Sequence, residues 1–220
     1  MRLILATRED AERVNHLRIE AYQNANGTVL RDFDFLRWSS ADDQACILCI
    51  EDDHGNLIAS VRVMQLNTLA ELESMCDCRL TTPLPLPTLY FDKLVALVEH
   101  RQKRLSMLFR LLIIEAAMNS GIQSFSFTIN ESAQRIPLMK KMGYQFSPAD
   151  TSHRSDDNVF DNSVDVLVAS LHFSLFPSAL MQGRKEQIVT LEDVALDDKL
   201  ANDLHGALRN AWSKKVLAPA

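Results

Sequence analysis

The stretch from residue 88 to residue 129 limits the possible folds most, because it sets one helix pattern between two strand patterns. "TLYFDKLVALV" (88–98) is nearly continuous in apolar residues, which is typical of a strand covered on both faces of a sheet. Apolar residues then recur at helical density from Arg104 to Asn119, just before Gly121, a residue type that commonly ends helices. "IQSFSFTI" (122–129) alternates as a strand does. We therefore expect a central strand, a long helix and a second strand.

The start of that helix is unusually basic. His100, Arg101, Lys103 and Arg104 stand where the helix dipole disfavours cations and favours anions. The whole chain carries a formal net charge of −6, so this local charge runs against the general balance, and nucleic-acid binding is not expected. The cluster is either a solvated run of charges or the binding site of an anion.

The remaining elements follow from caps, turns and periodicity. Thr7, with Asp10 three residues later, predicts the capped start of a helix. Gly55 supplies the turn of an antiparallel hairpin. A long ordered loop such as residues 24–44 is usually functional. The other expected elements are strands at 2–6, 45–51 and 57–66, a helix from Thr7 to Asn24, and a helical segment at 67–78. A short helix with Pro137 in its first turn should end at Gly143 and lead into another strand, followed by a polar loop at 148–162 and a last core strand at 163–173.

The 220 residues suit one large domain with an appendage. We expect a domain over 1–175, followed over 176–220 by a linker around "GRKEQ" and one capped amphipathic helix from residue 190 to Trp212. The leucine stripe of this helix needs a covering surface, either the core or a partner such as a second copy in a homodimer.

The cysteine spacing and the hydropathy of the chain argue against a metal site, a secretory signal and a membrane span. Cys46 and Cys49 fall in one predicted strand, where residues three apart face opposite sides and cannot hold one metal ion. We expect reduced core cysteines and no metal site. No stretch is apolar enough for a secretory signal or a membrane span, so a cytoplasmic protein is expected.

The order of these elements resembles that of the GNAT superfamily of acyltransferases. In that family the central strand ends in a turn of the form Arg/Gln-x-x-Gly-x-Gly/Ala, whose amides hold the diphosphate of coenzyme A. Here Arg101 matches the first position, whereas Arg104 and Ser106 replace the two glycines. A second landmark appears as Asn130, Ala133, Gly143 and Tyr144. The resemblance implies an α/β (α+β) fold with a mixed, mostly antiparallel central sheet flanked by helices, here with a C-terminal helical extension.

Other residues resemble one branch of this family, the autoinducer synthases and long-chain N-acyl amino acid synthases. Arg18 and Tyr22 stand in the early helix, Arg62 in a hairpin strand and Asp92 near the acidic position before the turn. Met139 replaces the tyrosine that protonates the leaving thiolate in common acetyltransferases.

That resemblance implies an N-acyltransferase that moves a medium or long acyl group from acyl-CoA, or from the phosphopantetheine of an acyl carrier protein, to a small-molecule amine such as an amino acid. Such a reaction needs a base for the ammonium, donors for the oxyanion and a proton for the thiolate. We assign these roles to Asp92 as base, the backbone of Leu94, Val95 and Ala96 as oxyanion donors, and Tyr144 or water as proton source.

The same resemblance assigns the binding residues. The donor is expected to contact Arg101, Lys103, Arg104, Leu105, Ser106 and Asn130, and the acceptor carboxylate Arg62 or Arg18, with Tyr22 beside them. Each residue also has a plain structural role open to it, such as an ion pair for Asp92 or core packing for Tyr144. Two alternatives remain: an acetyl-CoA-dependent N-acetyltransferase and an inactive thioester-binding or dimerisation module.

Overall fold

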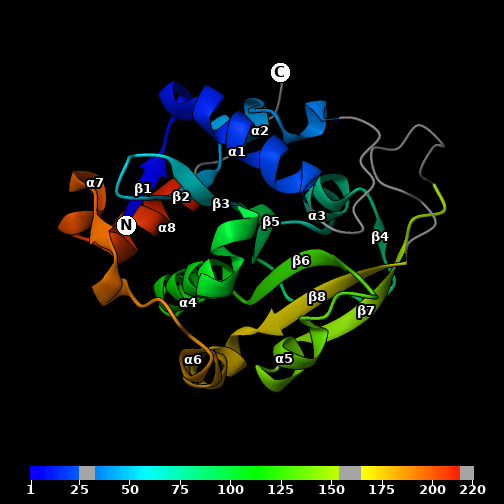
Figure 1. Cartoon of the computed structure of the whole chain (residues 1–220). Helices are drawn as coiled ribbons and strands as arrows, with labels where there is room; N and C mark the ends of the chain where they lie inside the picture. Colours follow the sequence, from blue (N-terminus) through cyan, green and yellow to red (C-terminus); the bar gives the residue numbers. More distant parts are fainter. Residues whose placement is uncertain (25–32, 154–164, 214–220) are drawn as a thin grey trace.

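The computed structural model describes residues 1–24, 33–153 and 165–213 (Figure 1). Within these residues nine strands join in one sheet, in the order β4-β7-β8-β6-β5-β3-β2-β1-β9. Neighbours are antiparallel except β5 with β6 and β1 with β9. The expected fold class, a mostly antiparallel mixed sheet flanked by helices, is confirmed. The strands are β1 (Arg2–Ala6), β2 (Cys46–Glu51), β3 (Leu57–Leu66), β4 (Arg79–Leu80), β5 (Thr88–Ala96), β6 (Ser124–Asn130), β7 (Gln145–Asp150), β8 (Val166–His172) and β9 (Ala195–Leu196).

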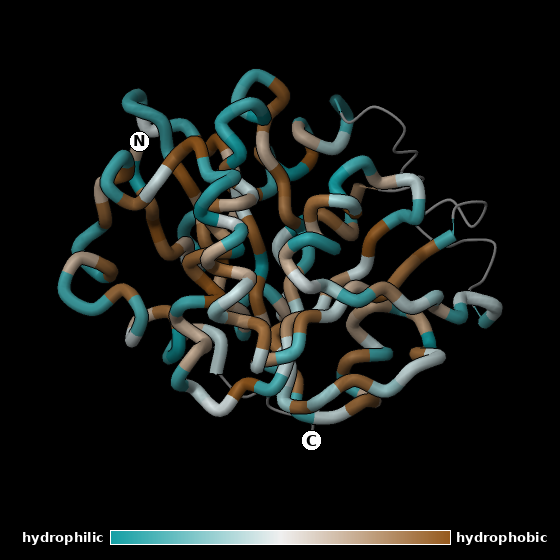
Figure 2. The backbone as a smooth tube through the Cα atoms, turned by 90° about the horizontal axis from the view of Figure 1, so that it is seen from below, coloured by the Kyte–Doolittle hydropathy of each residue, from teal (hydrophilic) through white to brown (hydrophobic). Residues whose placement is uncertain are grey.

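Helices cover both faces of the sheet, as Figure 1 shows with α1 and α3 above it and α4, α5 and α6 below it. One hydrophobic cluster joins α1 and α3 to the upper face, and a larger one joins α4, α5, α6 and α8 to the lower face. In Figure 2 the brown hydrophobic stretches run mainly through the interior. The helices are α1 (Ala11–Gln23), α2 (Ser40–Asp43), α3 (Leu69–Cys76), α4 (Leu105–Ala117), α5 (Ile136–Lys141), α6 (Phe176–Lys185), α7 (Asp198–Ala201) and α8 (Leu204–Trp212).

Most of the locally encoded elements are confirmed. Thr7 and Asp10 form a capping box ahead of α1, and Gly55 takes a positive φ in the β2–β3 turn. Cys46 and Cys49 pack into different clusters on opposite faces of the sheet, and both are buried. Of the loop expected at 24–44, residues 25–32 lie outside the described part, as do residues 154–162 of the loop expected at 148–162.

The prediction of one helix over 190–212 is wrong. The segment instead contains the short strand β9, which pairs in parallel with β1, and then the two helices α7 and α8. The side chains of Asp197 and Asp203 accept from the amides of Leu200 and Gly206, so each aspartate caps a new helix start and divides the segment.

The tail packs on the core of the domain. Leu208 and Trp212 of α8 are buried in the lower cluster, against α4. The "GRKEQ" segment, expected as a linker, lies partly in α6, which runs to Lys185. Within α6, a Cβ added at Gly183 would stand 2.6 Å from Leu111 Cδ2, so the missing side chain allows α6 to approach α4 closely.

The feature that positions the candidate site is a separation of the two central strands. β5 and β6 pair only at Thr88–Ser124, Leu89–Phe125 and Tyr90–Ser126, and their pairing ends there. From Phe91 to Ala96 the edge of β5 that faces β6 therefore has no strand partner. We call this opening the splay. Parallel strands that separate in this way leave backbone donors and acceptors free for a ligand.

A β-bulge lies in β5 beside the splay. Arg62 pairs with Asp92 and Ser60 with Val95, so two residues of β5 lie opposite one residue of β3. Lys93, within the bulge, has φ of 46°, an uncommon conformation for a residue other than glycine. The extra residue directs the side chain of Lys93 to the upper face, where Asp92 also points.

Candidate functional site

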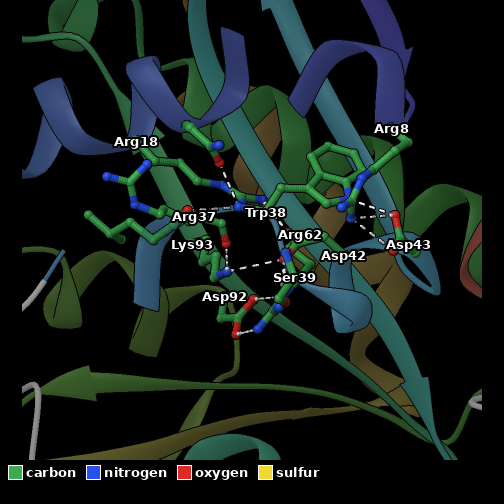
Figure 3. Close-up of polar contacts among 12 residues, drawn as sticks. Arg8, Arg18, Arg37, Trp38, Ser39, Asp42, Asp43, Arg62, Asp92 and Lys93 are labelled. Atoms are coloured by element: carbon green, nitrogen blue, oxygen red, sulfur yellow. Dashed lines mark hydrogen bonds and ion pairs between the residues drawn. The ribbon is translucent and has the colours of Figure 1, made fainter. Parts of the chain in front are cut away.

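The upper face of the sheet carries a buried cluster of charges, drawn in Figure 3. Its centre is Asp42 of α2, whose side chain is fully buried. Its carboxylate oxygens lie 2.8 Å from Arg18 Nη2, 3.3 Å from Arg62 Nη1 and 3.2 Å from Lys93 Nζ. Burial opposes ionisation, but these three cations outweigh it and lower the pKa of Asp42 to about 2. Asp42 is therefore ionised and ties α2 to α1, β3 and β5.

Arg62 forms a second pair, with Asp92 directly across the β3–β5 ladder. Arg62 Nε donates to Oδ1 at 2.7 Å, and Nη2 donates to Oδ2 at 2.5 Å. Burial disfavours the charge of Arg62, but Asp92 and then Asp42 outweigh it, and its pKa is raised. The Asp92 side chain keeps 17% exposure, whereas that of Arg62 keeps 6%. The open side of the cluster is therefore the side of Asp92.

The cluster carries an excess of positive charge. Arg18, Arg62 and Lys93 are three cations, and Asp42 and Asp92 are two carboxylates. Burial, then the neighbouring arginines, lowers the pKa of Lys93 to about 8. Near neutral pH the lysine is mainly protonated, so the cluster carries about one net positive charge. Such a cluster attracts an anionic group of a small molecule.

Tyr22 and Arg135 lie at the open side of the cluster. Burial, then the charge of Asp92, raises the pKa of Tyr22 to about 12, and its ring meets that of Phe35 edge-on at 6.3 Å. Arg135 lies between β6 and α5, and its side chain is exposed. The surrounding protein nevertheless lowers the pKa of Arg135, and the nearby Tyr22 opposes this shift. This combination is typical of a side chain in a recess. Arg135 was not among the predicted site residues, although it lies between Asn130 and Gly143 of the second family landmark.

The basic turn contacts the protein itself. Arg101 Nη2 donates to the carbonyl of Ala21 in the last turn of α1 at 3.3 Å, and Arg104 forms an ion pair with Glu186 at 2.8 Å. Lys103 is half-buried. Two of the three cations predicted to bind phosphate therefore already have protein partners, and their role in donor binding stays a prediction.

Arg104 also keeps the backbone conformation that a glycine would favour. It lies at the N-cap of α4 with φ of 52° and ψ of 39°, the left-handed conformation. A residue with a Cβ takes this conformation at a cost of roughly 1 kcal/mol. The first amides of α4, at Leu105 and Ser106, belong to the set that a helix leaves without intrahelical acceptors. The turn can therefore present amides to an anion although its glycines are replaced.

The structure does not bring the two predicted catalytic side chains together. Asp92 points to the upper face, whereas Tyr144 is buried in the lower cluster, edge-on to Phe127 at 5.6 Å. Leu94, Val95 and Ala96 line the splay from β5, and Asn130 is exposed at the end of β6. These roles stay predictions. The described residues contain no group of three metal-ligating side chains and no helix long and apolar enough to cross a membrane.

Several proteins of known structure have a fold similar to that of this chain. No protein-family model and no curated protein sequence matches the chain. The solved structure of MesI, a CoA-dependent acyl-homoserine lactone synthase, is 15% identical, with a TM-score of 0.53 over 90% of this chain and 100% of that chain. BjaI, another such synthase, solved with SAM and isopentyl-CoA, is 14% identical, with a TM-score of 0.57 over 89% and 92%.

An N-acetyltransferase from Staphylococcus aureus is 14% identical, with a TM-score of 0.50 over 78% of this chain and 97% of that chain. At identities this low the likeness concerns the fold alone. The chain has the fold shared by GNAT N-acetyltransferases and acyl-homoserine lactone synthases, in agreement with the resemblance seen in its sequence.

Proposed function

We propose that this chain is an N-acyltransferase. It takes an acyl group from a phosphopantetheine thioester, carried by coenzyme A or an acyl carrier protein, and transfers it to the primary amine of a small acceptor that also bears a carboxylate, such as an amino acid. The observation that carries the proposal is the position of the positively charged cluster beside the splay, next to the helix start at α4.

The donor binds along the splay in this proposal. Its phosphate meets the first amides of α4 with Lys103 and Arg104 nearby, and its pantetheine arm replaces the missing strand neighbour of β5. A free amide between Leu94 and Ala96 then donates to the thioester oxygen as it becomes an oxyanion. The chemistry needs no metal, only a fixed thioester and a deprotonated amine.

The acceptor binds over the upper face. Its carboxylate is held by the excess positive charge of the cluster, with Arg135 as the accessible guanidinium, because Arg62 is already engaged with Asp92. Its ammonium meets Asp92, whose oxygens keep lone pairs beyond those used by Arg62. Asp92, directly or through water, then receives the proton that the amine must lose.

The reaction balances within these parts. The ammonium first gives one proton to Asp92, directly or through water, and the amine nitrogen then attacks the thioester carbon, so that a C–N bond forms, the C–S bond breaks and the thiolate leaves. The nitrogen loses its second proton after the attack, and this proton passes to the thiolate. Water relays the second proton, because Tyr144 is buried on the lower face beside Arg110.

The test is release of free thiol from acyl-CoA and acyl carrier protein donors, from acetyl to long chains, with a mixture of amino acids. Thiol release that requires an amino acid, and that falls at least about ten-fold in Asp92→Asn, supports the proposal. Asp53→Asn, on the exposed β2–β3 turn, is the matched control and keeps the activity.

The donor range separates the alternatives. Use of acetyl-CoA alone would favour a simple N-acetyltransferase, and use of carrier-bound donors alone would make an acyl carrier protein the partner. No thiol release with any donor and acceptor would leave the binding or dimerisation module as the better assignment.

A further inference from the structure

Arg110 is a buried cation that the proposed reaction does not use. It lies in the middle of α4, a helix that is otherwise almost entirely apolar toward the core, and its exposure is 3%. A guanidinium has five N–H donors and no acceptor, and burying it without a carboxylate or carbonyl partner is costly. Such a group in a hydrophobic core therefore requires an explanation.

Its surroundings are aromatic. The guanidinium carbon lies 4.5 Å from the ring centre of Phe91 in β5 and 4.5 Å from that of Phe127 in β6. Cation–π attraction to these two rings offsets part of the burial cost but satisfies no N–H group. Tyr144 lies on the same side and is itself buried.

Arg110 and Tyr144 have no hydrogen-bond partner among the described residues other than each other. Arg110 Nη1 and Tyr144 Oη are both buried, the two side chains lie within reach of one another, and no ion pair with Arg110 occurs in the described ranges. Burial lowers the pKa of Arg110 to about 10, so the guanidinium stays charged at neutral pH. Arg110 and Tyr144 thus form a buried pair of donors between aromatic rings, with no carboxylate or carbonyl acceptor among the described residues.

The pair lies at the narrow end of the splay. Phe91 and Phe127 are the residues that directly follow Tyr90 and Ser126, the last pair of the β5–β6 ladder. The thioester of the proposed donor lies beside Leu94 to Ala96, toward the open end. Leu94 lies three residue steps from Phe91, which at roughly 3.3 Å a step is about 10 Å at most, and the bulge shortens this span. An acyl chain that runs down the splay from the thioester therefore ends near Arg110.

We propose that Arg110, with Tyr144, binds a carboxylate at the far end of the acyl chain, so that the preferred donor is the monothioester of a dicarboxylic acid. This inference rests on the proposed function. A carboxylate would accept two parallel bonds from the guanidinium and one from the tyrosine hydroxyl, which satisfies both groups. The apolar middle of the chain would pack against Phe91 and Phe127.

Equilibrium binding tests this proposal without turnover. Calorimetry compares adipoyl-CoA with hexanoyl-CoA, which have equal chain lengths and differ in a terminal carboxylate against a methyl group. The native chain should bind adipoyl-CoA at least about ten-fold more tightly, as expected for a charge-assisted pair in a buried site. Equal or weaker binding of adipoyl-CoA would overturn the proposal.

Two variants test whether Arg110 causes the preference for adipoyl-CoA. Arg110→Met should reverse the ratio, because it removes the charge and keeps a flexible apolar side chain of similar length. Arg184→Met, at an exposed arginine of α6 on the far side of α4, is the matched control and should keep the native ratio. A preference that survives in Arg110→Met would contradict the assignment, which would leave Arg110 as a cation–π contact of the core.

Two measurements keep the outcome decisive. If Arg110→Met fails to fold, Arg110→Lys is measured in its place, because it keeps the charge without the planar guanidinium. Arg110→Lys should retain part of the preference for adipoyl-CoA. Thiol release with an amino acid separates the two proposals. Turnover of hexanoyl-CoA with no preference for adipoyl-CoA would overturn this inference alone, whereas tight adipoyl-CoA binding with no turnover of any donor would overturn only the proposed transfer.

Discussion

Arg62 in β3 and Asp92 in β5 occupy facing positions of one ladder and join through two hydrogen bonds, Nε to Oδ1 at 2.7 Å and Nη2 to Oδ2 at 2.5 Å. The pair lies beside the bulge and links the buried Asp42 to the open side of the cluster. It therefore serves both stability and the proposed chemistry, because Asp92 is held in one orientation toward the acceptor.

Removal of Arg62 should destabilise the fold strongly. Arg62→Met leaves Asp92 partly buried without its cation and takes one of three cations from Asp42, so we expect a loss of about 3 kcal/mol in the free energy of unfolding. Urea denaturation measures it. The double variant Arg62→Met with Asp92→Leu should lose less than the two single variants combined. Additive losses would contradict the coupling.

The charge of Asp42 should make stability depend on acidic pH. Its pKa in the folded chain is about 2 against an ordinary 3.8, so its contribution is fully present above about pH 4.5 and is lost as the pH falls toward 2. The difference corresponds to about 2 kcal/mol. Unfolding free energies measured from pH 5 to pH 2 test this contribution. Asp42→Asn should be less stable than the native chain at pH 5, and its unfolding free energy should change less over that range. An equally steep profile in Asp42→Asn would assign the effect to other carboxylates.

The charge of Lys93 should control acceptor binding at alkaline pH. Its pKa of about 8 lies below the ordinary 10.5, so the unfolded chain binds the extra proton and this group favours folding more as pH rises from 8 to 10.5. Over the same range the cluster loses its excess charge, so KM for a carboxylate-bearing acceptor should rise about ten-fold.

Steady-state kinetics from pH 7 to pH 10 measure that rise in KM. Lys93→Met should have a higher KM at pH 7 that changes little with pH. The donor KM is the internal control, since the thioester does not contact the cluster. A native acceptor KM that stays level to pH 10 would exclude Lys93 from acceptor recognition.

The left-handed conformation of Arg104 predicts that glycine is tolerated better than alanine at this position. Arg104→Gly should be about 1 kcal/mol more stable than Arg104→Ala, because glycine takes the left-handed N-cap of α4 without strain. Both variants lose the exposed ion pair with Glu186, worth less than about 1 kcal/mol. Chemical denaturation of the two variants measures the difference.

The same two variants test donor binding at the turn. If the side-chain cation holds the phosphate, both should raise the donor KM. If the amides of α4 hold it, Arg104→Ala should leave the donor KM unchanged and Arg104→Gly should lower it, because glycine lets the phosphate approach the backbone more closely. A donor KM unchanged in both, and in the double charge reversal of Arg101 and Arg104 to Glu, would remove the phosphate from this turn.

Local patterns were enough to predict much of the fold. The capping box at Thr7, the turn at Gly55 and the end of α4 near Gly121 each depend on a few neighbouring residues, and each is confirmed. Local patterns failed in the tail. There the leucine spacing indicated one helix, whereas Asp197 and Asp203 start separate helices and β1 recruits β9 as a neighbour. That strand pairing joins residues almost two hundred positions apart, which periodicity does not report.

The residue types of the site can be read from the amino-acid sequence: the arginines in α1 and β3, the aspartate in β5, the basic turn before α4 and the arginine within that helix. The partners of these residues depend on the fold. Asp42 received three cations from separate elements, Arg101 and Arg104 turned to Ala21 and Glu186, and Arg110 came to lie against two phenylalanine rings with Tyr144 beside it. This is because the interaction energy of a buried charge depends on the groups that share its low-dielectric surroundings, and only folding brings those groups together.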